Sequence, residues 1–135
     1  MGARQPGRRG RTRDEQGAAV TDFAMVSVLL MLVFALTLQV GLALWTRNTL
    51  IAAAQEGARL AARADSTLAA GTVRTRDIIT GQLSDRFAQD VTASTSDVAG
   101  VAVVVVTVRA PLPVLGPFGP AGALEVHGRA FLESQ

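Results

Sequence analysis

The chain has 135 residues, of which 49% are hydrophobic and 18% are charged, and its formal net charge is +2. It contains no Cys and one His, which excludes disulfide frameworks, thiolate metal sites and metal sites that need two His ligands from one chain. Aromatic residues make up only 4%, too few to build stacking platforms for bases or sugars, so we expect no metal, no cofactor and no nucleic-acid partner.

The first 16 residues, MGARQPGRRGRTRDEQ, are basic and carry almost no apolar side chains. Such a segment buries too little surface to order itself. Its arginines are typical of the positive flank that keeps an amino end in the cytoplasm. This explains them better than a twin-arginine export signal at Arg8-Arg9 or a nucleic-acid-binding arm. We therefore predict a basic cytoplasmic leader over residues 1–17.

Residues Phe23 to Trp45 form an uncharged, apolar stretch. As a helix it is roughly 34 Å long, enough to cross a hydrocarbon core of about 30 Å. Trp45 suits the membrane interface, and Arg47 marks the return to water. We predict one membrane span, with the amino end in the cytoplasm and a single small domain outside. The run is too long for a cleaved secretory signal, although residues 52–54 offer the A-x-A pattern of one.

Two helices are predicted. The first runs from about Thr21 to about Ala64, because strong helix formers without Pro follow the span, and Gly57 is its weak point. A break over residues 65–72 precedes a second, amphipathic helix from about Thr72 to about Asp90. The apolar face of this second helix consists of Ile78, Ile79, Leu83, Phe87, Ala88 and Val91.

Strands follow the second helix. Val101–Ala110 is almost entirely β-branched, which indicates a strand buried on both faces, or on one face by a helix and on the other by a partner. Leu124–Leu132 alternates as a second strand, with its even-numbered residues on one side. Residues 92–100 are turn-rich and have room for a short edge strand, and residues 111–122 form a Pro/Gly loop. The fold class is α+β, with a small antiparallel sheet of two or three strands in an exported domain over residues 65–135, after a helix over residues 18–64.

The start of the span carries the sharpest functional signal. Gly17 is followed by four small or apolar residues beginning at Ala18, and then by Asp22 directly before the apolar run. An acid is costly at the edge of hydrocarbon. Asp22 alone is explained by the dipole at a helix start, which favours an anion. The whole arrangement of basic leader, glycine, small residues, acid and span favours a more specific interpretation.

This arrangement resembles a type IV prepilin-type leader, and the chain resembles the TadE-like family, minor pilins or pseudopilins of the tight-adherence pilus system. The resemblance rests on QGAAVTDFAMVSVLLMLVF and AAQEGARLAARA, and more weakly on VRAPLPVL and GRAFLE. It implies a pilin-like fold and cleavage by a prepilin peptidase between Gly17 and Ala18. Asp22 is then the fifth residue of the mature chain, where the family usually has Glu, and pairs with the free amine of a neighbouring subunit.

The sequence Gln55-Glu56-Gly57-Ala58-Arg59 matches the EGAR signature of that family. Its functional interpretation is a contact surface on the exposed helix, where Glu56 and Arg59 meet a neighbour and Gly57 allows close approach. The alternative is that the small residues let the second helix or the sheet of the same chain pack here. Both interpretations stay open at the level of sequence.

No catalytic residue is predicted. His127 lies on a strand without a motif around it, and the chain has no Ser-centred elbow, phosphate loop or usefully spaced pair of acids. We therefore expect a structural protein, not an enzyme, that acts in pilus or secretion-apparatus assembly at the bacterial inner membrane. Its expected partners are membrane lipid, a prepilin peptidase and other pilin or pilus-assembly proteins. The alternative is a membrane-anchored extracytoplasmic binding or sensor module.

Overall fold

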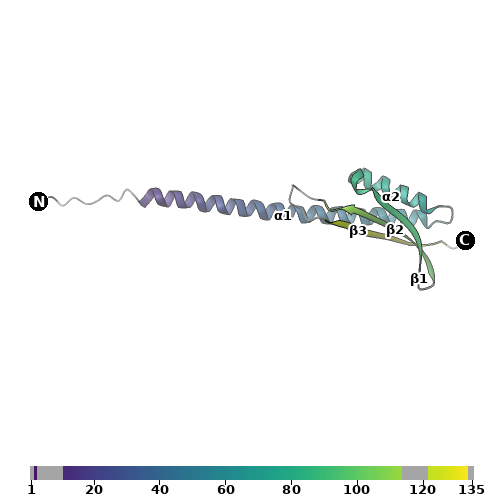
Figure 1. Ribbon diagram of the computed structural model, residues 1–135. Coiled ribbons are helices and arrows are strands. Elements are labelled where there is room, and N and C mark those ends of the chain that lie inside the picture. The colour runs from purple at the N-terminus through teal and green to yellow at the C-terminus, as the bar shows by residue number, and fades with distance from the viewer. Residues whose placement is uncertain (1, 3–10, 114–121, 134–135) are drawn as a thin grey trace. The chain divides into compact units, whose positions relative to one another are not determined.

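The structure is a computed structural model that describes residues 2, 11–113 and 122–133. Contacts divide the chain into two units, Met1–Leu38 and Gln39–Gln135, and each is described by itself. The elements in chain order are the helices α1 (Arg11–Ala61) and α2 (Leu68–Gln82), the 3₁₀ turn η1 (Asp85–Phe87), and the strands β1 (Asp90–Val98), β2 (Val101–Pro111) and β3 (Ala123–Phe131) (Figure 1). The predicted α+β class, with a small antiparallel sheet, is confirmed.

The first unit consists of the amino-terminal part of α1. Its large apolar side chains are exposed all round the helix, as Phe23 and Met31 illustrate at 74% each. α1 includes a stretch long and apolar enough to cross a membrane. Exposed hydrocarbon on every side of a helix is unfavourable in water and favourable in lipid. The chain therefore has a single-pass membrane anchor.

The hydroxyl groups of Ser27 and Thr37 within the anchor are satisfied by their own helix. The Ser27 hydroxyl donates to the Phe23 carbonyl at 2.8 Å, and the Thr37 hydroxyl donates to the Val33 carbonyl at 2.9 Å. A bilayer offers no water to polar groups, so this i to i−4 bonding lets Ser and Thr occur in the span at little cost.

The predicted bounds of the first helix are wrong at its start. The helix begins at Arg11 instead of near Thr21, so the expectation that the leader does not order itself fails for residues 11–16. Adding residues to an existing helix fixes one residue per hydrogen bond, whereas starting one is costly. The apolar span supplies the start, and the helix extends backwards from it. Leader residues 3–10 lie outside the described residues.

The second helix is shorter than predicted and begins at Leu68 instead of about Thr72, so the predicted break over residues 65–72 is wrong for its last five residues. Thr67 caps its start by accepting from the Ala70 N–H at 3.1 Å. It ends at Gln82, because the Leu83 backbone leaves helical geometry at φ −121° and ψ −101°. Most of the predicted apolar face is nevertheless buried: Ile79 lies on α2, Phe87 on η1 and Val91 on β1, whereas Ile78 and Leu83 are partly buried. The spacing therefore predicted burial correctly but not the element that provides it.

The sheet is antiparallel in the order β1-β2-β3. Val108 pairs with Val91 on one side and with Val126 on the other, and all three are buried on one face of the sheet. Ala99 and Gly100 both have positive φ, 55° and 81°, as a two-residue hairpin turn between β1 and β2 requires. The edge strand expected to be short is nine residues long. Of the predicted loop, residues 114–121 lie outside the described part of the chain.

The core of the second unit lies between the carboxyl-terminal part of α1, α2 and the sheet. Figure 1 shows α2 and the strands gathered along this part of α1. A narrow apolar stripe of α1 is buried here: Leu50, Ala54 and Ala58 are fully buried, and Ala61 is 4% exposed. The small side chains allow close approach, since a Cβ on Gly128 of β3 would overlap the backbone of Ala54. After β3, the Glu133 N–H donates to the Ala62 carbonyl at 3.0 Å.

The valine run of β2 is buried unevenly. Val104, Val106 and Val108 are fully buried on the inner face, against the helices. On the outer face, Val103 is 4% exposed whereas Val101 is 47% exposed. Within the chain, then, the run is covered by helices on one face and only partly covered on the other.

Candidate functional site

The predicted cleavage and pairing residues lie together on α1. Gly17, Ala18 and Asp22 are all exposed. Ala18 and Asp22 are four residues apart, so they occupy one face of the helix. The Gly17 carbonyl accepts a hydrogen bond from the Thr21 hydroxyl at 2.9 Å, and a Cβ on Gly17 would meet open space. Packing within the described chain therefore does not require a glycine at position 17.

The three residues of the predicted helix contact do not share one face. Gly57 is buried against α2, where a Cβ would overlap the Thr75 hydroxyl and lie 2.6 Å from the Gly71 carbonyl oxygen. Arg59 is about 200° further round the helix and is exposed. Glu56 is half-buried and lies about 60° from Arg59. Gly57 thus serves packing within the chain, and a contact of Glu56 and Arg59 with a neighbour stays a prediction.

The helix pair at Gly57 is tight on both sides. A Cβ on Gly71 would lie 2.6 Å from the Ala61 Cβ and 2.7 Å from the Gly57 carbonyl oxygen. Beside this crossing, the buried Thr75 hydroxyl donates to the Gly71 carbonyl at 2.9 Å and lies 3.4 Å from the Ala53 carbonyl. The glycine of the EGAR sequence therefore fixes how closely α2 approaches α1.

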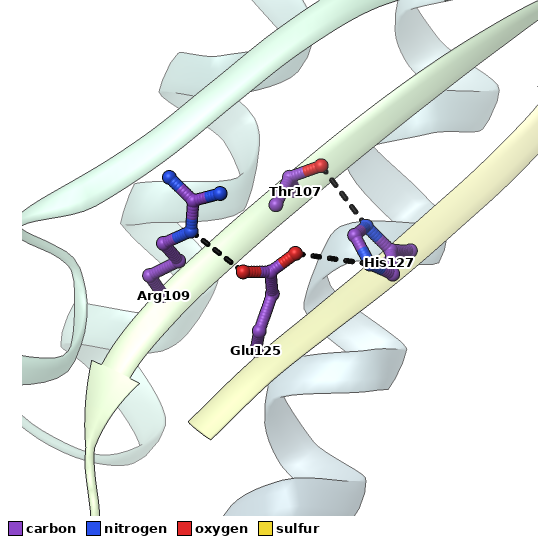
Figure 2. A network of polar contacts seen from close by, with 4 residues as sticks. All are labelled: Thr107, Arg109, Glu125 and His127. Atoms are coloured by element: carbon purple, nitrogen blue, oxygen red, sulfur yellow. Dashed lines mark hydrogen bonds and ion pairs between the residues drawn. The ribbon is translucent and has the colours of Figure 1, made fainter. Parts of the chain in front are cut away.

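A polar network covers part of the outer face of the sheet (Figure 2). Arg109 and Glu125 are directly opposite on β2 and β3, and the Arg109 Nε donates to Glu125 Oε2 at 2.6 Å. Thr107 and His127 form the next opposite pair on this face, with 3.0 Å between Thr107 Oγ1 and His127 Nδ1. His127 Nε2 lies 3.3 Å from Glu125 Oε1. Sequence reasoning missed this network because it depends on strand register.

The network does not have the features of a catalytic site. Its order of hydroxyl, imidazole and carboxylate is that of a nucleophile, its base and an orienting acid. The Glu125 carboxylate, however, is also bound by Arg109, and the His127 and Glu125 side chains are 43% and 42% accessible on an open sheet face. The network is better explained as cross-strand pairing that stabilises the β2–β3 register. No cluster of residues suited to a metal ion occurs among the residues described.

The Arg109–Glu125 pair makes stability depend on pH. The hydrogen bond from Arg109 is the main cause of a lowered pKa at Glu125, whose ordinary value is 4.5; desolvation opposes the shift, and the charges of Arg109 and His127 assist it. A lowered folded-state pKa adds stability that is present above the unfolded pKa and lost as pH falls through the folded one. As the pH falls below 4.5, the melting temperatures of wild type and Glu125→Gln should therefore approach each other, and thermal unfolding at a series of pH values measures this.

Both side chains are exposed, so the effect is small and is best isolated with a cycle of variants. The melting temperatures of wild type and Arg109→Gln should also approach each other as the pH falls. The melting temperature of the double variant should follow that of either single variant. If the difference in melting temperature between wild type and each variant stays constant over this pH range, Arg109 and Glu125 do not form a stabilising ion pair.

One family model, described as TadE-like protein, matches residues 17–59. The matched segment contains Gly17, Ala18 and Asp22, the whole predicted span, and the EGAR sequence with Gly57. The resemblance inferred from these motifs is therefore confirmed over residues 17–59. No curated protein and no solved structure matches the chain.

Proposed function

We propose, from the premise that residues 17–59 carry the TadE-like pattern, that this chain acts as a minor pilin or pseudopilin-like membrane protein. Its role is structural, in the assembly of a bacterial pilus or a related secretion apparatus, and it performs no chemistry itself. The match carries the proposal because one segment contains the predicted cleavage point at Gly17 and Ala18, the span and the EGAR sequence.

The exposed anchor supports a mechanism of lateral helix packing. In the bilayer its apolar side chains contact lipid, which stores the subunit at the membrane. During assembly, neighbouring helices bury these side chains against one another. Asp22 is exposed at the start of the apolar run, where a charge needs a partner. We assign it the free amine of Ala18 on a neighbouring subunit, because opposite charges in a low-dielectric bundle are stabilised only by close pairing.

This function includes a topology and a processing step. The arginine-rich leader is cytoplasmic and the second unit is outside the inner membrane, as the distribution of basic residues favours. A prepilin peptidase acts on the cytoplasmic side and cuts between Gly17 and Ala18. The open space around Gly17 supports recognition by another protein as the reason for this glycine, since packing among the described residues does not need it.

The test is mass spectrometry of the full chain after co-expression with a prepilin peptidase. We expect a new amino terminus at Ala18 in the wild type and no detectable cleavage of Gly17→Arg, since a long cationic side chain then precedes the bond. Gly10→Arg adds the same charge to the leader without changing the bond and should be cut like the wild type. An intact leader in the wild type would favour the membrane-anchored binding module instead.

A further inference from the structure

A pocket lies beside α1 where the apolar run ends. Its volume is about 200 Å³. It is lined by Leu42 and Trp45 of α1, by Gln82, Ser84 and Arg86 at and after the end of α2, and by Pro113 after β2. The pocket therefore joins three segments that are far apart in the sequence, which is why sequence reasoning did not find it.

The walls of the pocket are fixed by specific contacts. The Gln39 side-chain amide donates to the Pro113 carbonyl at 2.6 Å, which holds the segment after β2 against α1. The Arg86 guanidinium lies 4.6 Å from the centre of the Phe87 ring. Phe87 is buried, so the ring is a fixed support. A guanidinium stacked on a ring keeps its N–H donors available at the edges.

The position of the pocket along α1 places it at the membrane surface. Leu42 and Trp45 are among the last large apolar residues of the span stretch, and Trp45 is 54% exposed. Trp residues favour the level of the lipid headgroups, with the ring facing hydrocarbon and the N–H facing polar groups. The pocket thus offers apolar side chains on its membrane side and polar ones from α2 and η1.

The charge of the pocket points to an anion. Arg86 is the one charged side chain among the described residues that line it, and Gln82 and Ser84 add uncharged polar groups. The neighbouring acid Asp85 is not a lining residue; its backbone carbonyl accepts from the Gln89 side chain at 2.9 Å. Guanidinium groups bind phosphate with parallel hydrogen bonds, and basic side chains near a bilayer attract anionic lipid.

We propose that this pocket binds the phosphodiester headgroup of an anionic phospholipid. Arg86 binds the phosphate, Gln82 and Ser84 contact the polar part of the headgroup, and the acyl chains follow Leu42 and Trp45 into the bilayer. Lipid bound in this way ties the end of α2 and η1 to the membrane surface. The proposal depends on the membrane anchor and not on pilus assembly, so it is tested separately from leader cleavage.

The chain's single tryptophan lines the pocket and reports on it directly. The full chain is placed in phosphatidylcholine nanodiscs that contain a small fraction of either brominated phosphatidylglycerol or equally brominated phosphatidylcholine, and quenching of Trp45 fluorescence is measured. We expect phosphatidylglycerol to be enriched at Trp45 about fivefold, the effect of one basic side chain at an anionic surface. Arg86→Gln should remove this enrichment and Arg86→Lys should retain part of it.

Arg74→Gln is the matched control, because Arg74 is exposed on α2 but lies eight residues before Gln82, about 12 Å along the helix from the pocket. It should leave the enrichment unchanged. Equal quenching by both lipids, as expected if a second protein chain covers the pocket, or an enrichment that persists in Arg86→Gln, would overturn the proposal.

Discussion

Gly128→Ala is expected to lower the free energy of unfolding of the second unit by about 3 kcal/mol, the upper part of the range for overpacked cores. A Cβ at this position would overlap the carbonyl group of Ala54 and the nitrogen of Gln55, all backbone atoms of α1. Backbone of a buried helix cannot rotate away as the end of a side chain can, so β3 must move off α1. Gly128 pairs with Val106 at the centre of β2, and the displacement would open the core.

The measurement is thermal unfolding of the full chain in detergent micelles, followed by circular dichroism. For a unit of this size, a loss of 3 kcal/mol corresponds to a fall in melting temperature of about 15 °C. Gly81→Ala is the matched control, because Gly81 lies on α2 and a Cβ there meets nothing within 4 Å. It should be stabilising by up to about 1 kcal/mol, since alanine favours a helix. Melting of Gly128→Ala at the wild-type temperature would show that β3 does not pack on α1 at Gly128.

Gly57→Ala is expected to lower the free energy of unfolding by about 2 kcal/mol, although alanine by itself favours a helix by about 1 kcal/mol. The new Cβ would overlap the Thr75 hydroxyl and lie 2.6 Å from the Gly71 carbonyl oxygen. Thr75→Ala removes the first obstacle and leaves the second, which is backbone. Adding Gly57→Ala to Thr75→Ala should therefore still lower the free energy of unfolding, but by less than Gly57→Ala lowers it in the wild type.

Gly41→Ala is the control for this prediction, because Gly41 lies on the same helix and a Cβ there meets open space. Measuring dilute monomer in detergent separates the two interpretations of the EGAR sequence. If Gly57 packs α2 within the chain, Gly57→Ala loses stability with no neighbour present. If Gly57 acts only in a contact between subunits, the monomer melts like Gly41→Ala and the defect appears only in assembly.

Several elements follow from local sequence because the property that defines them is local. Phe23 to Trp45 has no charge, so a membrane anchor is predicted whatever the rest of the chain does. The β-branched run from Val101 and the alternation from Leu124 predict β2 and β3, two of the three strands in the structure. The family match over residues 17–59 covers the span and the short motifs on either side of it.

The ends of the two helices are poorly predicted from sequence, because residues beyond the local segment decide where each helix begins or ends. The four-residue spacing of Ile79, Leu83 and Phe87 predicts one helix, but the chain leaves helical geometry at Leu83 and buries Phe87 from η1 instead. The start at Arg11 was missed because composition describes an isolated segment, whereas this one continues an existing helix.

By itself, the sequence determined the anchor, the existence of β2 and β3, and the motifs at Gly17, Asp22 and Gly57, since each depends on residues a few positions apart. Only the tertiary structure decided what these residues touch. It places Gly57 against Gly71, Gly128 against Ala54, Arg109 against Glu125, and Trp45 in one pocket with Arg86. The physical reason is that close approach, cross-strand register and pocket shape depend on distances between remote segments, and these are fixed only when the core packs.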